Sequence, residues 1–163
     1  MGPSGPKWIY VEMKKFRGSS FHTIDSKGRI IIPARFRQLL QNDGDDDGIM
    51  VTQQDNCLYA YPYDEWDQLE TKIASLSETS ETIRRFRRRF IGNAHDCKCD
   101  KQDRILIPPS LRHYAALDKE IVLAGVGKYF EIWARDRWDQ EMVNVDDELK
   151  DKESRNEIAK LGI

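Results

Sequence analysis

The sequence predicts an α+β fold made of two pseudo-symmetric halves. The first observation is an internal repeat, since residues 25–33 (DSKGRIIIP) return as residues 100–108 (DKQDRILIP) at a displacement of 75. The second is the order of elements, because short strand-like runs alternate with helical stretches in each half, which favours α+β over a parallel α/β sheet. The third is the length of 163 residues. It suffices for one core but leaves each half marginal alone, so we expect the halves to interlock.

The repeat extends beyond this motif. Four further positions match, two at a displacement of 75 and two at 72: Phe36 with Leu111, Arg37 with Arg112, Tyr61 with Trp133, and Trp66 with Trp138. The shift of three residues falls at the polar loop of residues 42–48. Two copies are too few for a solenoid, so we expect them to pair in one body.

The first half opens with two strands and a short helix. Residues 21–25 are typical of a strand, and the turn that follows contains Gly28, which is free to adopt a positive φ. Residues 29–32 are typical of a second strand, and their unbroken Ile run indicates burial on both faces. Pro33 suits a first helical position, so residues 34–40 are expected to form a short amphipathic helix.

A hairpin and two helices complete the first half. Residues 49–52 and 57–61 are typical of paired strands. Apolar residues at spacings of 3, 4 and 3 predict a helix from Tyr63 onward: Trp66, Leu69, Ile73 and Leu76. Another helix is expected to begin near Ser80, which can cap it, with acidic residues close by.

The second half repeats this order. We expect strands at residues 95–99, 104–107, 121–124 and 129–133, and helices at 110–117 and from Arg135. Beyond Val145 the tail is charged and weakly periodic, so its end is expected to fray. The resulting division is a flexible leader or tag (1–13), a first repeat with its helix (14–79), a second repeat with its helices (80–140) and an acidic C-terminal tail (141–163).

The net charge of −2 conceals a strong segregation of charge. Residues 14–40 hold seven Lys or Arg and only one acidic residue, whereas residues 41–82 hold eleven acidic residues and one Lys. Residues 83–104 are basic again, with eight basic and three acidic residues, and residues 139–163 are acidic. Both basic blocks contain or adjoin the repeated motif, as expected of a face that binds phosphate.

The arrangement Asp-x-x-Gly-Arg, a β-branched run, Ile-Pro and a short Arg-bearing helix resembles the AbrB-type swapped-hairpin fold. Doubled, with Phe16-Arg17-Gly18 ahead of it and the aromatic pairs closing each half, it resembles the MraZ family of bacterial transcriptional regulators. The resemblance implies two swapped-hairpin β-barrel halves with peripheral helices. It also implies a cytoplasmic, nucleoid-associated repressor that forms ring-like homo-oligomers. Its target would be double-stranded DNA, in repeated guanine-rich boxes at the promoter of the division and cell-wall gene cluster.

The motif transfers to this chain residue by residue. Asp25, Gly28 and Arg29 match it in full, whereas the second copy keeps Asp100 and Arg104 but replaces Gly with Asp103. Asp can adopt the left-handed region, so the second turn is expected to survive. The extra carboxylate beside Arg104 is expected to weaken its attraction for phosphate.

The motif and the basic blocks together select candidate DNA contacts: Arg17, Lys27, Arg29, Arg35, Arg37, Lys101 and Arg104. Arg29 is the best candidate to read guanine edges, although it could instead pair with Asp25 and close the turn. Asp25, Gly28 and Asp100 are expected to be structural residues of the turns, because a polyanion repels carboxylates.

Two other clusters have competing interpretations. The arginines of residues 84–89 could contact DNA, but a solvated face or salt bridges within or between subunits is favoured. His95, Cys97 and Cys99 would point to one face of a strand, yet Cys-x-Cys is a weak metal signal and filling of the core is favoured.

The sequence lacks the motifs of several function classes. It contains no Walker loop or dinucleotide fingerprint and no plausible nucleophile for its three His, so we expect neither an enzyme, nor a cofactor, nor a small-molecule substrate. No apolar run approaches the roughly 20 residues that cross a bilayer, so no membrane partner is expected. The three Cys have no framework spacing, which fits a reducing cytoplasm. The alternative function is an antitoxin-like or other protein-interaction module whose acidic tail wraps a partner; a metal-dependent enzyme is a distant third.

Overall fold

The computed structural model describes residues 15–40, 47–76 and 79–163. The leader predicted at residues 1–13 and most of the predicted polar loop lie outside these residues. Within them, strands and helices mix along the chain as the α+β prediction requires, and that prediction is confirmed. None of the described helices is long and apolar enough to cross a membrane.

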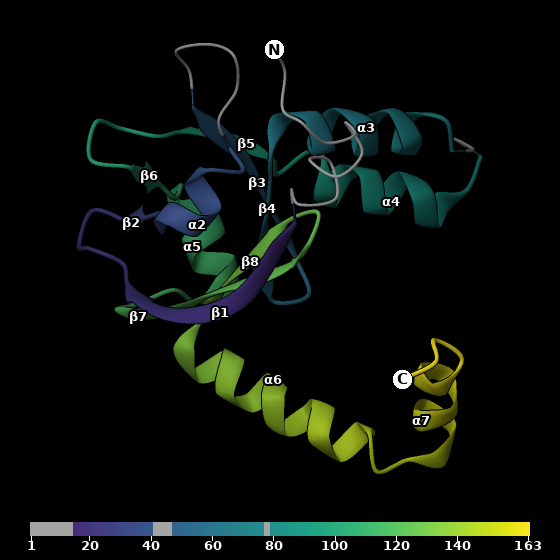
Figure 1. Ribbon diagram of the computed structural model, residues 1–163. Coiled ribbons are helices and arrows are strands. Elements are labelled where there is room, and N and C mark those ends of the chain that lie inside the picture. The colour runs from purple at the N-terminus through teal and green to yellow at the C-terminus, as the bar shows by residue number, and fades with distance from the viewer. Residues whose placement is uncertain (1–14, 41–46, 77–78) are drawn as a thin grey trace, which may run out of the picture.

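The strands form one large sheet and one small ribbon (Figure 1). The sheet has six strands in the order β1-β7-β8-β4-β3-β5, and the ribbon pairs β2 with β6; all pairs are antiparallel. The strands are β1 Phe16–Thr23, β2 Arg29–Ile31, β3 Gly48–Gln54, β4 Cys57–Tyr61, β5 His95–Lys98, β6 Arg104–Leu106, β7 Glu120–Gly127 and β8 Phe130–Ala134.

The two repeats exchange strands. β1 of the first repeat pairs with β7 of the second, β5 of the second pairs with β3 of the first, and the ribbon takes one strand from each. The central β4–β8 pair also crosses between the repeats. The halves therefore interlock as expected. Among the described strands, however, neither sheet closes into the barrels that the resemblance implied.

The core contains side chains from both repeats. The rings of Phe16 and Phe36 from the first repeat lie 5.4 and 4.8 Å from the ring of Phe130 in the second. All three are nearly or fully buried, and they belong to one apolar cluster with the inward residues of the ribbon, Ile30 and Ile105. Burial of large aromatic rings contributes strongly to folding stability, so these contacts bind the repeats into one cooperative unit.

Helices cover the sheet and extend from it. They are α2 Ala34–Arg37, α3 Tyr63–Ala74, α4 Glu81–Phe90, α5 Pro109–Ala115, α6 Arg135–Glu148 and α7 Lys152–Ala159. The side chain of Ser80 accepts a hydrogen bond from the backbone N–H of Ile83, so the predicted cap of α4 is confirmed. Trp66 of α3 and Phe90 of α4 stack at 5.6 Å, which holds these helices together.

Two predictions for local structure are wrong. The Ile run is not buried on both faces, because Ile31 is 57% exposed between the fully buried Ile30 and Ile32. The ribbon is covered on one side only, so its residues alternate between core and solvent. The tail does not fray beyond Val145, since α6 continues to Glu148 and a further helix, α7, follows with Asp151 as its cap.

Candidate nucleic-acid interface

The first repeated motif forms a tight loop closed by its own carboxylate. Asp25 accepts hydrogen bonds from the backbone N–H groups of Lys27 (3.0 Å) and Arg29 (2.8 Å). Its second oxygen accepts from Nε of Arg29 at 2.7 Å. Gly28 has a φ of 89°, a conformation that glycine adopts without steric cost. The loop thus orients Arg29 through Nε and leaves its two terminal amino groups outside this bond.

The second motif builds the same loop with different residues. Asp100 accepts from the backbone N–H groups of Gln102 (2.8 Å) and Arg104 (3.0 Å) and from Nε of Arg104 at 2.9 Å. Asp103 takes the place of glycine with a φ of 62°. The turn therefore survives the substitution, as expected from the tolerance of Asp for the left-handed region.

These hydrogen bonds lower the pKa of both carboxyl groups. The backbone N–H of Arg29 is the largest cause for Asp25, and that of Arg104 is the largest cause for Asp100. A carboxylate with a lowered pKa stabilises the folded loop above its ordinary pKa, and this stabilisation disappears as the pH falls through the lowered pKa. Both loops should therefore stay closed at neutral pH.

We expect the carboxyl carbons of Asp25 and Asp100 to titrate below the ordinary value of 3.8 in an NMR pH titration. In Arg29→Ala, the pKa of Asp25 should rise towards the ordinary value because its side-chain partner is lost, while that of Asp100 should not move. A midpoint at or above 3.8 for Asp25 in the unmodified chain would show that the loop is open in solution.

The ribbon brings the two arginines onto one outward face. Arg29 lies opposite Leu106 and Ile31 lies opposite Arg104. Because Ile30 and Ile105 point into the core, these four neighbours face outward, and Ile31 and Leu106 are 57% and 54% exposed. The face therefore alternates guanidinium groups with apolar side chains in a pseudo-twofold pattern.

Both turns protrude from the same side of the molecule, the left side in Figure 1, away from α3 and α4. Each turn is anchored to the strand of the other repeat. The backbone N–H of Ile107 donates to the carbonyl of Gly28, and that of Ile32 donates to the carbonyl of Asp103, both at 2.9 Å. The predicted contacts Lys27 and Lys101 lie exposed within these turns.

Sequence comparison agrees with this double architecture. A family model described as "MraZ protein, putative antitoxin-like" matches the chain twice, over residues 15–89 and 90–157. The chain belongs to the MraZ family. Within that family it is 57% identical to the transcriptional regulator MraZ of Desulforapulum autotrophicum over 148 residues, covering 91% of this chain and 99% of the relative. It is 48% identical to that of Desulfosudis oleivorans with the same coverage, and 46% identical to that of Syntrophobacter fumaroxidans over 76% of this chain and 82% of the relative.

The remaining predicted DNA contacts do not all lie at the turns of the two repeated motifs. Arg35 donates from Nη2 to the hydroxyl of Ser20 on β1 at 2.9 Å and packs over the ring of Phe36. Arg17 lies near the start of β1, whereas the first turn follows the end of that strand. At about 3.3 Å per residue, roughly 25 Å of strand separate Arg17 from Asp25. Arg17 and Arg35 therefore lie along the edge strand, apart from Arg29.

The carboxylate of Asp103 was expected to weaken the attraction of Arg104 for phosphate, but it does not pair with Arg104. Its carboxylate lies 2.8 Å from Nη1 of Arg37, which comes from the other repeat. The cation that Asp103 neutralises is therefore a different predicted DNA contact. Arg104 keeps the same ion pair with its own loop as Arg29 does.

The sequence did not predict one basic residue that lies beside the first turn, Arg112. The guanidinium of Arg112 in α5 packs against Gly28, so that a Cβ on this glycine would lie 2.6 Å from the guanidinium carbon. The repeat contained the signal, because Arg112 is the counterpart of Arg37. Only the strand exchange, however, brings it to the first turn.

The arginines of α4 are largely engaged in structural contacts. Arg87 donates to the carbonyls of Ile73 and Leu76 at the end of α3, and Arg89 donates to the hydroxyl of Tyr114 at 2.6 Å. Arg85 pairs with Glu81 one turn away. Arg87 and Arg89 thus tie α4 to α3 and α5 through neutral acceptors, whereas the Arg85–Glu81 pair is a salt bridge of the kind favoured from the sequence.

The Cys-x-Cys segment contributes to the core. Cys97 is 4% exposed, and burial raises the pKa of its thiol to about 12. Cys99 packs against the same cluster, whereas His95 points to solvent. Among the described residues, no group of three His, Cys, Asp or Glu side chains gathers as a metal site requires.

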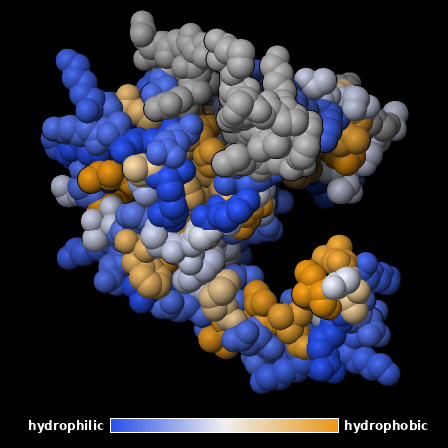
Figure 2. All heavy atoms as spheres, in the orientation of Figure 1, coloured by the Kyte–Doolittle hydropathy of each residue, from blue (hydrophilic) through white to orange (hydrophobic). Residues whose placement is uncertain are grey.

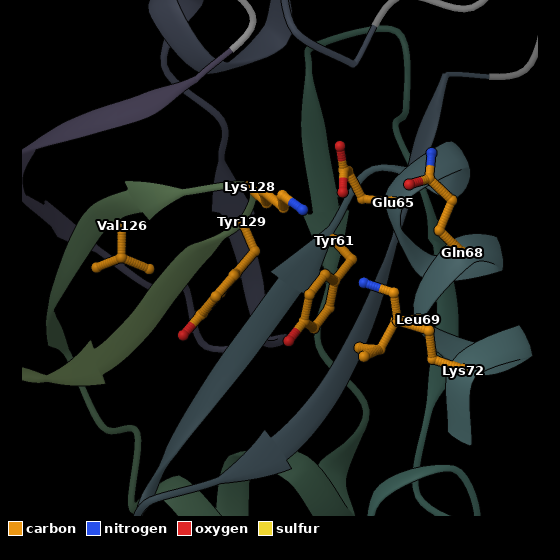
Figure 3. Close-up of a pocket in the computed structure, with 8 residues that line it drawn as sticks. All are labelled: Tyr61, Glu65, Gln68, Leu69, Lys72, Val126, Lys128 and Tyr129. Atoms are coloured by element: carbon orange, nitrogen blue, oxygen red, sulfur yellow. The ribbon is translucent and has the colours of Figure 1, made fainter. Parts of the chain in front are cut away.

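A separate cleft of about 320 Å³ lies between α3 and the β7–β8 hairpin (Figure 3). Tyr61 and Tyr129 stack at 4.8 Å on one side of it, and Glu65, Lys72 and Lys128 contribute charged groups to its lining. Burial raises the pKa of both tyrosines, so they stay neutral at physiological pH. This cleft shares no residue with the two turns.

Proposed function

We propose that this chain is a sequence-specific DNA-binding transcriptional regulator that contacts DNA through its two protruding turns. The observation that carries the proposal is the paired presentation of Arg29 and Arg104 on one outward ribbon face, each oriented by its own Asp. The names of the relatives, all transcriptional regulators, support the same conclusion. A polyanionic ligand also explains why the basic residues gather at the repeated motif.

The geometry suggests a division of labour on this face. Lys27 and Lys101 would neutralise phosphates at the tips of the turns, which provides salt-dependent affinity. Arg29 and Arg104 would each present their terminal amino groups to the O6 and N7 atoms of guanine in the major groove. Ile31 and Leu106 would contact thymine methyl groups beside them. The Asp–Arg pair and DNA contact are therefore compatible, since the Asp uses only Nε.

The finer features implied by the family belong to the same proposal. The exchange of β1 and β5 between repeats supports an AbrB-like swapped-hairpin arrangement, although the sheet is open. We extend the proposal to repression in the bacterial cytoplasm, with the protein associated with the nucleoid. The target would be repeated guanine-rich boxes at the promoter of the division and cell-wall gene cluster.

The test is binding to the DNA upstream of the chain's own gene. Fluorescence anisotropy should give saturable binding to a labelled fragment of this region that unlabelled copies of the fragment displace. A shuffled fragment of equal composition should compete poorly. Equal affinity for both fragments would reduce the proposal to non-specific binding, and no binding to either would overturn it.

Self-association is the second part of the proposal. Helices α6 and α7 form an arm that extends from the body (Figure 1), and apolar residues line the side of the arm that faces the body (Figure 2). The exposed apolar residues of this arm are Met142, Val143, Ile158, Leu161 and Ile163. In the first repeat, α4 covers Trp66, whereas Trp138 lines an open cleft of about 460 Å³. A second copy would cover this apolar surface, and repetition of the same contact from copy to copy would build the ring-like oligomer.

We expect Ile158→Asp combined with Leu161→Asp to shift the solution mass from an oligomer towards the single chain of 19.1 kDa. Both residues are exposed at 37% and 74%, so the change removes contacts between copies without opening the core. Multi-angle light scattering measures the mass. Glu153→Gln is the control, since this exposed residue in the first turn of α7 does not line the cleft beside Ile158, and it should leave the mass unchanged.

An unmodified chain that is already a monomer at micromolar concentration would contradict this part of the proposal. The arm also sustains the alternative function, a protein-interaction module whose tail wraps another protein. Tight binding of the arm to a different protein, without DNA binding by the turns, would favour that alternative.

A further inference from the structure

Each turn contacts one arginine from the helix of the other repeat. Arg112 of α5 lies against Gly28 in the first turn, and Arg37 of α2 lies against Asp103 in the second. The two arginines occupy equivalent positions in the repeat, so the two arrangements are pseudo-symmetric. They differ in the residue at the left-handed position of the turn, which is Gly in one and Asp in the other.

This single difference changes the charge available at each turn. The carboxylate of Asp103 binds Arg37 at 2.8 Å and neutralises it. Gly28 offers no side chain, and among the described residues Arg112 has no ion pair within 4.0 Å. Its Nε is buried against the turn without a hydrogen-bond acceptor in the described part of the chain. Because Nε is closed off by the turn, a charged acceptor from another molecule would have to meet the two terminal amino groups of Arg112, which carry no hydrogen bond or ion pair among the described residues.

Arg112 lines a cleft of about 600 Å³ beside the first turn. The carboxylate of Asp25 also lines this cleft, but it is engaged with Arg29 and with the backbone of its own loop. Asp118 and Lys119 contribute one charge of each sign. The cleft therefore sets the guanidinium of Arg112 beside two carboxylates and one ammonium group, and one of the carboxylates, Asp25, is already paired with Arg29.

We propose that Arg112 binds a DNA phosphate beside the first turn, while Asp103 keeps Arg37 from doing the same at the second. The inference rests on the proposed function and adds a residue to it. Each DNA-binding turn is then a composite of both repeats. The chain presents one strong and one weak half, so it contacts the two halves of its DNA site unequally.

The test is a set of charge variants measured for affinity and salt dependence on the upstream DNA. Arg112→Met removes the charge and keeps the aliphatic stem. It should weaken binding about fivefold to tenfold at 0.1 M salt and lower the salt slope by about 0.9. Arg112→Lys keeps the charge and should retain most of the slope. A structural role for Arg112 would instead leave the slope of folded Arg112→Met unchanged.

The opposite change should occur at the second turn. Asp103→Gly releases Arg37 and should tighten binding about fivefold to tenfold, with a slope steeper by about 0.9. Adding Arg37→Met should cancel this gain. The inference is overturned if folded Arg112→Met binds as the unmodified chain does, or if the gain persists without Arg37. If the Arg112 and Arg37 variants do not behave as expected, the proposed function is still tested by the Arg29 and Arg104 variants. A chain that binds no DNA overturns both the inference and the proposed function.

Discussion

Replacing Arg29 with Ala should lower the affinity for the upstream DNA by about 10- to 100-fold while the protein stays folded. A bidentate contact between an arginine and guanine contributes roughly 1–3 kcal/mol of discrimination, or about 5- to 160-fold in affinity, and the expected loss lies within these limits. The fold should tolerate the change because the Arg29 side chain is partly exposed at the start of β2, and the backbone bonds of Asp25 remain. Anisotropy measures affinity, and circular dichroism checks the fold.

Two comparisons give this result its meaning. Arg104→Ala should also weaken binding, but by a smaller factor, because the second turn lacks a free counterpart of Arg112. Arg85→Ala is the matched control, since this exposed arginine of α4 pairs with Glu81 and lies outside the turns. A protein that unfolds on loss of Arg29 would reveal a structural residue, and unchanged binding would remove Arg29 from the interface.

The largest effect on stability is expected at the aromatic contact between the repeats. Phe130 is fully buried and packs against Phe16 and Phe36 of the other repeat. Phe130→Ala removes a large ring from a packed core, so it should lower the free energy of unfolding by about 3–5 kcal/mol. Because the repeats exchange strands, this loss should appear in both halves at once.

Urea denaturation gives the free energy, and native-state hydrogen exchange shows where it is lost. The amides of β3 and β7 should lose protection by similar amounts. Val126→Ala, at a position 46% exposed, is the control and should change stability by no more than about 0.5 kcal/mol. Loss of protection in β7 alone would mean that the repeats fold as independent units.

The repeat and the fold class were predictable because local sequence patterns are enough to indicate both. The alternation of apolar runs and turn residues marked most strands and helices, and Ser80 marked the start of α4; the first strand, however, begins at Phe16 and not at Phe21, and α7 was missed. The exchange of strands follows from pairing between residues far apart in the chain, about which these patterns carry little information. The exposed position of Ile31 was missed for the same reason, since only the partner strand shows which face of the ribbon is covered.

The candidate site divides in a similar way. Asp25, Arg29 and their counterparts could be found because the hydrogen bonds that each Asp accepts lie within five consecutive residues. The contacts of Arg37 and Arg112 cross between the repeats, so sequence proximity assigned Asp103 to the wrong arginine. The charge and weak periodicity of the tail favoured fraying, whereas the tail forms the capped helix α7 with exposed apolar residues such as Ile158.

Site-directed photocrosslinking tests most directly whether the two turns contact DNA. A benzoylphenylalanine placed at Lys27, at Lys101 or at Lys72 of α3 would be irradiated with the upstream DNA bound. The account predicts crosslinks from the residues at 27 and 101, with the yield falling as salt is raised, and none above background from the residue at 72. Crosslinks from α3 with none from either turn would contradict it.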